Sequence, residues 1–348
     1  MKPYLTTRSL LPENQESPIE LLQEWQTEDS LFYLRNHFPY PQLSQHSFDL
    51  PIFGHIPQPK VFTYKEIQAM PSKTLTVLLE CAGNKRSYFE PKVYGEQWEQ
   101  GAISQGTWKG VPLAYLLSIT GLLSSAKEVV FEGSDYGTRT DMEGVFYYGR
   151  SLPLDKALHP DTIIAYEFNG KPIPYKHGYP YRLIVPQWYA MASVKWLKRI
   201  MIIDHAYRGP FQSIDYQYYP DPEGDEGKQP VTTMNVNSII QKPLPYEVLN
   251  QGVHEITGIA WSGKGRVVEV DVSVDGGKSW NRAKPVFSSA QSYTWTLWSY
   301  TWEVHDAGEY VIWSRARDTE GRIQPQQPFW NRKGYGYHAI PKVNVKVE

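Results

Sequence analysis

The sequence predicts an α+β domain followed by an all-β domain, a sandwich of immunoglobulin-like type. Through residues 1–229, helical and strand patterns are mixed without strict β–α–β alternation. A stretch rich in Pro, Gly and acidic residues, 216–230, has the composition of a linker or a long loop. Beyond it, residues 230–348 consist of alternating apolar and polar runs separated by Gly, Asp-Gly and Pro turns. We therefore expect two domains, residues 1–229 and 230–348.

The elements of the first domain follow from local patterns. The first 50 residues are irregular and Pro-rich, with one short helical pattern at 19–25. A helix is predicted over 112–123, where apolar residues recur at helical spacing, with Pro112 in its first turn and Gly121 near its end. Extended apolar runs predict four strands, at 73–83, 127–135, 181–186 and 194–204.

The second domain shows a strong hairpin pattern at residues 272–280. The sequence VSVDGGKSW joins two extended runs at Asp275-Gly276-Gly277. Together with HEITGIAWSG, YTWTLWSYTWEV, GEYVIWSRARDTEG and PKVNVKVE, it gives about seven short strands, a number typical of an immunoglobulin-like sandwich.

The composition excludes several classes of function. With 35 basic and 37 acidic residues the net charge is -2, which offers no bulk attraction to nucleic acid or anionic membranes. No apolar run is long enough to span a membrane. The N-terminus lacks the apolar core of a secretory signal, and a single cysteine cannot form an intramolecular disulfide. We expect a cytoplasmic protein.

Cys81 is the first candidate for chemistry. A predicted strand leads into Cys81 and then into Ala82-Gly83-Asn84, small residues that let other groups approach the backbone closely. Lys85 and Arg86 follow, and nearby positive charge favours the thiolate, the form that binds soft metals. The alternative is a buried, inert cysteine, which is common in proteins.

Basic side chains in apolar surroundings form the second group of candidates. Arg35 and His37 flank Asn36 in RNHFPYP, and an arginine fork is suited to oxyanions. The alternative for this pair is a surface ion pair and a histidine that is hydrogen-bonded in the core. His177, Arg182 and Lys195 stand near or within apolar strands, where unpaired charge is costly. A bound anion would account for the last three together; a scattered surface placement is the alternative.

Taken together, these stretches resemble the sulfite oxidase family of molybdopterin enzymes. The resemblance runs from about Tyr33 to the C-terminus. The matching segments are RNHFPYP, ECAGNKRS, WEQGAISQGTWKGVPL, FEGSD, SLPLDKAL, IAYEFNGKPIPYKHGYPYRLIVP, SVKWLKRI, GIAWSGKGRVVEVDVSVDGGKSW and PFWNRKGYG.

The resemblance implies a molybdenum–molybdopterin cofactor, with Cys81 as the protein's ligand to the metal and oxygen-atom transfer as the reaction. It implies that Arg35 and Arg86 line the pocket for a small oxyanion substrate, that Trp98 walls it, and that Tyr216 hydrogen-bonds substrate. The residues that it implies at the cofactor are Asn36, His37, Asp135, His177, Arg182 and Lys195.

Two positions depart from the family pattern. Where sulfite oxidases carry an arginine near the C-terminus that reaches the anion pocket, this sequence has Lys333, which keeps the charge but loses the bidentate fork. An arginine usual before SVKWL is replaced by Ala192. The first change puts sulfite in doubt as the substrate.

We expect no haem, flavin or nicotinamide in this chain, so electrons would pass to a separate acceptor such as a cytochrome or a quinone-linked protein. The second domain resembles the family's dimerisation domain, which implies a homodimer. Two alternatives remain: a reductase of nitrate or of an S- or N-oxide on the same scaffold, and a non-catalytic binding protein that retained the fold.

Overall fold

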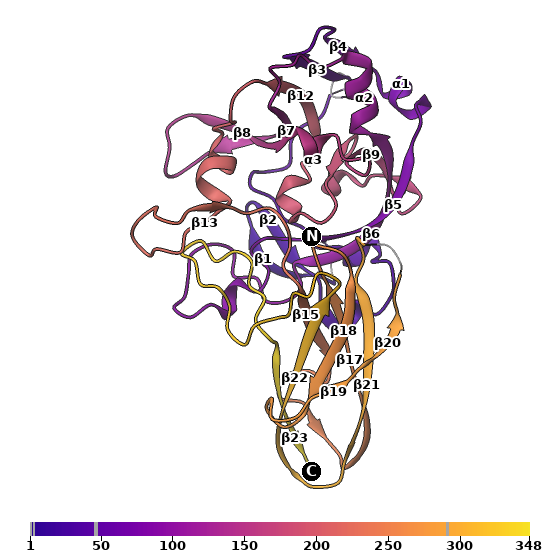
Figure 1. The fold of residues 1–348 in the computed structure, drawn as a ribbon, viewed down its shortest axis with the longest axis vertical. Helices are drawn as coiled ribbons and strands as arrows, with labels where there is room; N and C mark the ends of the chain where they lie inside the picture. Colours follow the sequence, from indigo (N-terminus) through magenta and orange to yellow (C-terminus); the bar gives the residue numbers. More distant parts are fainter. Residues whose placement is uncertain (1, 3, 45–47, 290–291) are drawn as a thin grey trace.

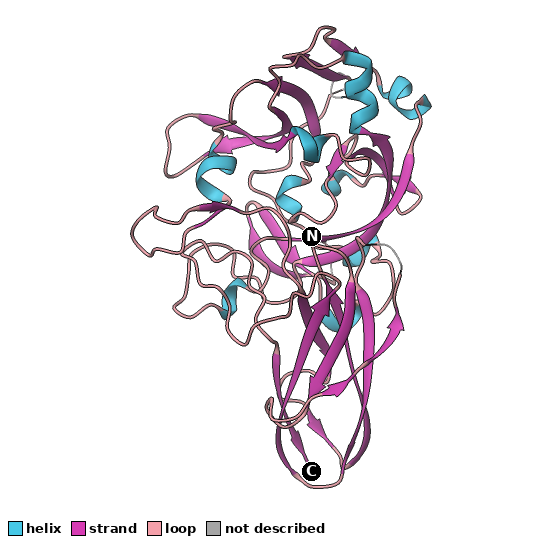
Figure 2. Ribbon diagram, viewed as in Figure 1, coloured by secondary structure: helices cyan, strands magenta, loops and turns pink. Residues whose placement is uncertain are grey.

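The computed structural model describes residues 2, 4–44, 48–289 and 292–348. Figure 1 shows a mixed α+β part and, extending from it, a narrow β part that ends at the C-terminus. Figure 2 shows short helices in the first part and long strands dominating the second. The predicted order, α+β followed by β, is confirmed. In the part of the chain that the structure describes, no helix is both long and apolar enough to span a membrane.

One sheet of the first part carries Cys81. Its strands run in the order β10 (Lys171–Pro172), β9 (Ile163–Phe168), β6 (Ile103–Pro112) and β5 (Lys73–Glu80), and β11 (Arg182–Ile184) also pairs with β9. Val77, Leu79 and Cys81 pack into one apolar cluster, whereas Leu78 packs into another. This alternation is the two-residue period of a strand, and it places the sulfur on the face away from Leu78.

A second sheet lies across the same domain. Its order is β4 (Lys60–Phe62), β3 (Leu50–Gly54), β12 (Leu197–Ile203), β7 (Glu128–Thr138) and β8 (Val145–Pro153). Strands β3 and β12 are parallel, and the other neighbours are antiparallel. The strands predicted at 73–83, 127–135, 181–186 and 194–204 correspond to β5, β7, β11 and β12 and are confirmed.

Helices are short and connect these sheets. They are α1 (Tyr64–Ala69), α2 (Leu113–Thr120) and α3 (Leu154–Ala157). Helix α1 begins at a capping box, in which Thr63 and Glu66 satisfy each other's backbone N–H groups. Helix α2 confirms the prediction at 112–123. Single turns occur at Ile19–Leu21, Asp29–Leu31, Arg86–Tyr88, Tyr175–His177, Ala190–Ala192 and Phe211–Asp215.

The helix expected at 19–25 is wrong beyond its first turn. Only Ile19–Leu21 is helical, as a 3-10 turn. The carbonyls of Ile19 and Leu22 accept hydrogen bonds from the side-chain amide of Gln241, each at 2.7 Å. Tertiary contact with the second part therefore replaces the helical hydrogen bonds that the pattern predicts.

The segment interpreted as a linker, 216–230, is partly structured. Strand β13 (Gln217–Tyr218) pairs with β14 (Gln229–Pro230), so the acidic residues between them form the loop of a small hairpin. Tyr216 itself is buried. The expected domain boundary between 229 and 230 falls within β14 and stays a prediction.

Two sheets form the second part. One has the order β15 (Asn237–Lys242), β17 (Gly252–Trp261), β21 (Thr296–Val304) and β20 (Lys284–Phe287). The other has the order β16 (Val248–Leu249), β23 (Lys342–Val347), β22 (Gly308–Asp318), β18 (Val267–Ser273) and β19 (Asn281–Arg282). One apolar cluster joins them, with Ile240 and Trp298 from the first and Val270 and Ile312 from the second. The immunoglobulin-like topology stays a prediction.

The hairpin predicted at 272–280 is present with a shifted second strand. Strand β18 pairs with β19, but β19 begins at Asn281 rather than within the predicted run. Asp275 accepts hydrogen bonds from the backbone of Lys278 and Ser279, each at 3.0 Å. These bonds hold the residues after the Gly pair in a wider loop.

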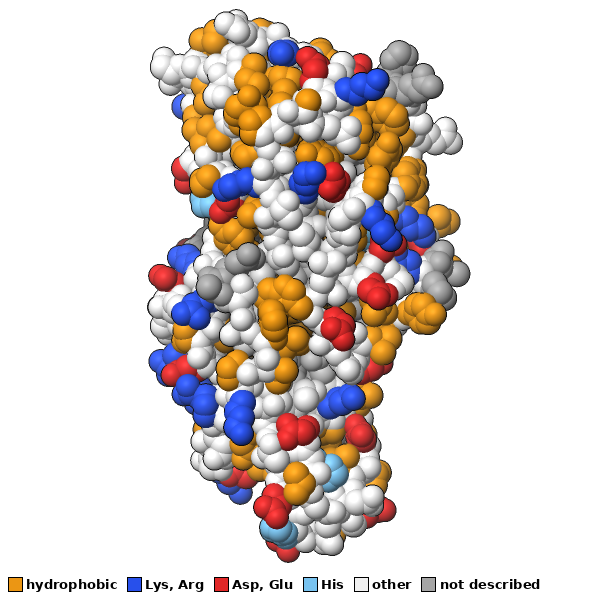
Figure 3. All heavy atoms as spheres, turned by 90° about the vertical axis from the view of Figure 1, so that its right-hand side faces the viewer, with side chains coloured by type: hydrophobic (Ala, Val, Ile, Leu, Met, Phe, Trp, Pro, Cys, Tyr) orange, Lys and Arg blue, Asp and Glu red, His pale blue; other side chains and the backbone are white. Residues whose placement is uncertain are grey.

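Buried polar contacts join the two parts. The Lys85 ammonium donates to the side-chain carbonyl of Asn237 (2.7 Å) and to the backbone carbonyl of Ser238 (2.8 Å). The Trp261 indole donates to the Glu80 carboxylate at 2.9 Å. On the outside, Figure 3 shows basic and acidic side chains interspersed over the face in view. That mixture agrees with the small net charge of the sequence.

Candidate active site

Cys81 lies where two cavities meet. Cavity A comprises about 600 Å³ of space and cavity B about 720 Å³, in both cases including space that is open to solvent. Four residues line both cavities: Arg35, His37, Cys81 and Tyr216. The sulfur is thus reachable from two sides, although only 6% of the Cys81 surface is exposed.

The electrostatics at Cys81 differ from the expectation. Burial raises the pKa of the thiol, and the positive charges of Arg35 and Arg86 only partly oppose this effect. Lys85, expected to help, points into the second part and contacts Asn237 instead. In the protein alone the thiol form is therefore favoured, and a bound metal cation would be needed to favour the thiolate.

Two guanidinium groups line cavity B. Arg35 donates to the carbonyl of Asn36, and Arg86 is buried and held by the carbonyls of Lys333 (3.2 Å) and Glu96 (3.1 Å). The guanidinium carbon of Arg86 also lies 5.0 Å from the centre of the Tyr335 ring. These contacts fix the positive charge of both groups beside Cys81, which suits the cavity to a small anion.

Tyr216 and His37 form a hydrogen-bonded pair. The Tyr216 hydroxyl lies 2.7 Å from Nε2 of His37, and the His37 ring stacks on Tyr148 with a centroid distance of 4.4 Å. Burial and the charge of Arg35 lower the pKa of His37 well below its usual range. The imidazole is therefore neutral and can accept from, or donate to, the phenol.

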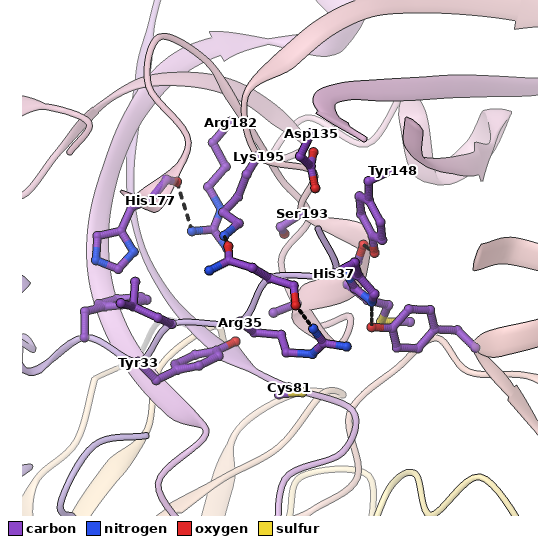
Figure 4. A pocket seen from close by; sticks show the side chains of 16 residues that line it. Tyr33, Arg35, His37, Cys81, Asp135, Tyr148, His177, Arg182, Ser193 and Lys195 are labelled. Carbon is purple, nitrogen blue, oxygen red and sulfur yellow. Dashed lines mark hydrogen bonds between the residues drawn. The ribbon is translucent and has the colours of Figure 1, made fainter. Parts of the chain in front are cut away.

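Cavity A carries the cationic groups expected at the cofactor. Figure 4 shows Cys81 and Arg35 on one side of it, with His177, Arg182 and Lys195 across the space. Arg182 donates to the carbonyl of His177 at 3.2 Å, and Lys195 donates to the side-chain carbonyl of Asn36. Burial lowers the pKa of Arg182 to about 10 and that of Lys195 well below its usual range. An anion bound between them would favour their charged forms.

Two residues of the cavity A lining carry buried polar atoms without a partner among the described residues. Asp135 lines cavity A, and one of its buried carboxylate oxygens has no hydrogen-bond partner among the described residues. Nε of Arg182 is buried without a partner in the same described set. Buried polar atoms are rarely left unpaired, so both atoms are available to a bound group.

The structure does not place every predicted residue in the lining. Arg35, Asn36, His37, Cys81, Asp135, His177, Arg182, Lys195 and Tyr216 line cavity A, and Arg86 and Lys333 line cavity B. Trp98 is absent from the lining of both. It is fully buried and packs with Phe32, Tyr33 and Cys81 in an apolar cluster. The expectation that Trp98 walls the anion pocket has no support in either lining and stays a prediction.

Several lining residues were missed from the sequence. Tyr33, Tyr148 and Ser193 line cavity A, and Asp215 and Tyr335 line cavity B. Tyr33, Asp215 and Tyr335 lie within two residues of predicted ones in the sequence, and that proximity was a usable signal. Tyr148 had none, because tyrosines are abundant here and its neighbours in space are distant in sequence.

Comparisons with known proteins match this geometry. Residues 37–211 match the oxidoreductase molybdopterin binding domain, and residues 228–348 match the Mo-co oxidoreductase dimerisation domain. The crystal structure of the sulfane dehydrogenase SoxCD from Paracoccus pantotrophus superimposes with a TM-score of 0.84 at 30% identity, covering 98% of this chain and 86% of that one. The chain belongs to the sulfite oxidase family of molybdopterin oxidoreductases.

Relatives in the family have different reactions in their names. Mitochondrial sulfite oxidase of Drosophila melanogaster is 34% identical over 99% of this chain, and NADH nitrate reductase of Cichorium intybus is 32% identical over 93%. The chain spans 63% of the length of the first and 38% of the second. Membership of the sulfite oxidase family therefore leaves the substrate open.

The residues present fit the molybdenum cofactor of the family. Cavity A offers cationic groups for a phosphate, and Asp135 and Arg182 offer unpartnered atoms for the polar edge of a pterin. Cys81 at its end offers a soft ligand to the metal. Among the described residues no group of three or more His, Cys, Asp or Glu could hold a metal ion.

Proposed function

We propose that the protein is a molybdenum-cofactor oxidoreductase that transfers an oxygen atom to a small sulfur oxyanion, sulfite or a related compound. One observation carries the proposal. The sulfur of Cys81 opens onto cavity A, with its cofactor-type lining, and onto cavity B, with its guanidinium groups. A metal held by Cys81 would face an anion held by Arg35 and Arg86.

Each side chain has a role in this proposal. When bound, the cofactor supplies the two-electron redox chemistry of oxygen-atom transfer. Arg35, Arg86 and Lys333 bind and orient the anion, and the Tyr216 hydroxyl donates a hydrogen bond to it. His37 holds Tyr216 in place. Asn36, His37, Asp135, His177, Arg182 and Lys195 bind the cofactor.

A reductase of nitrate, or of an S- or N-oxide, is the second candidate. The similarity to a nitrate reductase supports it, and so does Lys333, which offers no bidentate fork to a substrate. The sulfur oxyanion is preferred because the similarity to a sulfite oxidase covers slightly more of the chain than that to the nitrate reductase, and because a matching solved structure is that of a sulfane dehydrogenase. A non-catalytic binding protein is disfavoured, because the side chains that the oxidoreductase reaction would use, Cys81, Arg35, Arg86 and Tyr216, are all retained around the two cavities.

The quaternary state, acceptor and location are part of the same proposal. The match to a dimerisation domain supports a homodimer. Electrons leave to a separate carrier, such as a cytochrome or a quinone-linked protein. The single cysteine is compatible with a reducing compartment, the cytoplasm. Light scattering of the purified chain tests the homodimer, and fractionation of its host cells tests the cytoplasmic location.

The central test measures cofactor content and turnover separately. Protein made in a cofactor-competent host is analysed for molybdenum and pterin, and then for sulfite-dependent reduction of a dye. We expect about one metal and one pterin per chain, with turnover of sulfite or a related sulfur anion. Full cofactor with turnover only of nitrate or an S- or N-oxide, using reduced viologen as donor, would replace the oxidase by the reductase. Absence of bound cofactor would remove both enzymes.

A further inference from the structure

Arg150 is a buried cation close to the proposed active site but outside both cavities. It lies on β8 and is 1% exposed. Its Nη1 donates to the carbonyl of Phe211. Its Nε has no hydrogen-bond partner, and no carboxylate forms an ion pair with it, within the chain as described. A buried guanidinium without a counterion is costly. Arg150 pairs with Phe131 across β7 and β8, close to a register shift in that strand pairing.

The aromatic ring beside Arg150 belongs to Tyr216. The guanidinium carbon lies 5.3 Å from the centre of that ring. Tyr216 in turn stacks on Tyr335, with centroids 5.2 Å apart and an interplanar angle of 28°, and Arg86 covers Tyr335 at 5.0 Å. The contacts thus run from one guanidinium through two tyrosines to another. Arg86 and both tyrosines line cavity B, whereas Arg150 stands behind them.

The surroundings of Tyr216 let the charge of Arg150 act on its hydroxyl. Its hydroxyl pairs with the neutral His37 at 2.7 Å, and no carboxylate hydrogen-bonds to that hydroxyl among the described residues. A guanidinium over a phenol ring attracts its π electrons. It also draws electron density from the hydroxyl, which strengthens the hydroxyl as a donor, and in a water-poor interior the effect is larger than in water.

We propose that Arg150 is a positioning residue that acts on the anionic substrate through Tyr216. Its guanidinium holds the phenol ring against Tyr335, and its charge strengthens the hydrogen bond that the Tyr216 hydroxyl donates to the anion. This inference rests on the proposed function, because it assumes that cavity B binds an oxyanion.

A double-mutant cycle separates this role from a structural one. The full chain, purified with its cofactor, is compared as wild type, Arg150→Met, Tyr216→Phe and the double variant. Sulfate serves as the probe anion, and calorimetry measures its Kd; sulfite turnover is measured alongside. We expect Arg150→Met to weaken sulfate binding about fivefold, less than the loss of a whole charge-assisted hydrogen bond, because the Tyr216 hydroxyl is still present. In the Tyr216→Phe background the same change should alter Kd less than about twofold, because the hydroxyl through which Arg150 acts is gone.

Two further variants keep the test decisive. Arg150→Lys retains the charge and should bind sulfate with an affinity between wild type and Arg150→Met. Arg315→Met removes a guanidinium that lies 4.2 Å from the Trp280 ring in the second part, and it should leave sulfate binding unchanged. Thermal midpoints are recorded for all variants. Since Arg150→Met removes an unpaired buried charge, its midpoint should fall little or rise.

The outcomes are distinguishable. Two outcomes would overturn the role of Arg150 and leave the proposed function standing. The first is an equal loss of sulfate affinity on Arg150→Met in the wild-type and Tyr216→Phe backgrounds. The second is a loss of affinity in both Arg150→Met and Arg150→Lys that parallels a fall in their thermal midpoints. Wild-type protein that carries the cofactor but binds no sulfate, sulfite or nitrate would overturn the anion pocket, and the role of Arg150 with it.

Discussion

The ammonium group of Lys333 lies 3.8 Å from a carboxylate oxygen of Asp215 in the lining of cavity B. Asp215 is also paired with Arg139 at 2.5 Å, and Arg139 is paired with Asp141 at 2.7 Å. Part of the positive charge of Lys333 is therefore neutralised before any substrate binds. The guanidinium groups of Arg35 and Arg86 are left as the main attraction for an anion.

Removing that neutralising carboxylate should strengthen anion binding. Asp215→Asn is expected to lower the KM for sulfite about threefold, since partly exposed ion pairs contribute up to about 1 kcal/mol. Steady-state kinetics at fixed ionic strength measure the change. Asp141→Asn is the matched control, because Asp141 also pairs with Arg139 but does not line cavity B. An unchanged or higher KM in Asp215→Asn would show that Asp215 does not restrain Lys333.

Replacing the sulfur should abolish turnover without unfolding the chain. Cys81→Ser exchanges one small buried side chain for another of similar size but takes away the soft ligand. We expect sulfite turnover to fall below detection, with a thermal midpoint of the cofactor-free protein within a few degrees of wild type. Dye-reduction assays and calorimetry measure the two quantities. Unchanged turnover would show that Cys81 is not the ligand.

His177 should make the fold sensitive to acid. Burial lowers the pKa of His177 to about 3, so the folded protein keeps it neutral, whereas the unfolded chain protonates it below about pH 6.5. The unfolded state then binds more protons between pH 6.5 and 3, and stability falls as the pH falls through that window. The slope is at most about 1.4 kcal/mol per pH unit.

Urea unfolding of the cofactor-free protein from pH 6.5 to 4.5 measures this slope. His177→Gln should reduce this slope, and the part that remains comes from the other buried neutral histidine, His37. The comparison variant is His305→Gln, whose side chain is 75% exposed in wild type, and it should leave the slope as it is. Equal slopes in wild type and His177→Gln would contradict the assignment.

Lys85 should stabilise the contact between the first and second parts of the chain rather than lower the pKa of the Cys81 thiol. Lys85→Met removes the bonds to Asn237 and Ser238 and leaves Glu80 buried without its nearby cation. We expect a loss of about 2–4 kcal/mol in the free energy of unfolding, measured as a lower thermal midpoint. Adding Glu80→Gln to Lys85→Met should restore part of the lost free energy of unfolding. Lys284→Met, at an exposed lysine, serves as the control.

The sequence by itself determined the class of fold, the strand that ends at Cys81 and the cationic residues around the proposed cofactor. These follow from local periodicity and from motifs whose members are close along the chain. Tertiary structure decided which way the side chains point. Lys85 follows Cys81 by four residues but turns to Asn237, because a left-handed backbone at Lys85 and the packed second domain direct it there. The stack of Arg150, Tyr216, Tyr335 and Arg86 joins four segments that no local pattern connects, and only the folded chain brings them within contact.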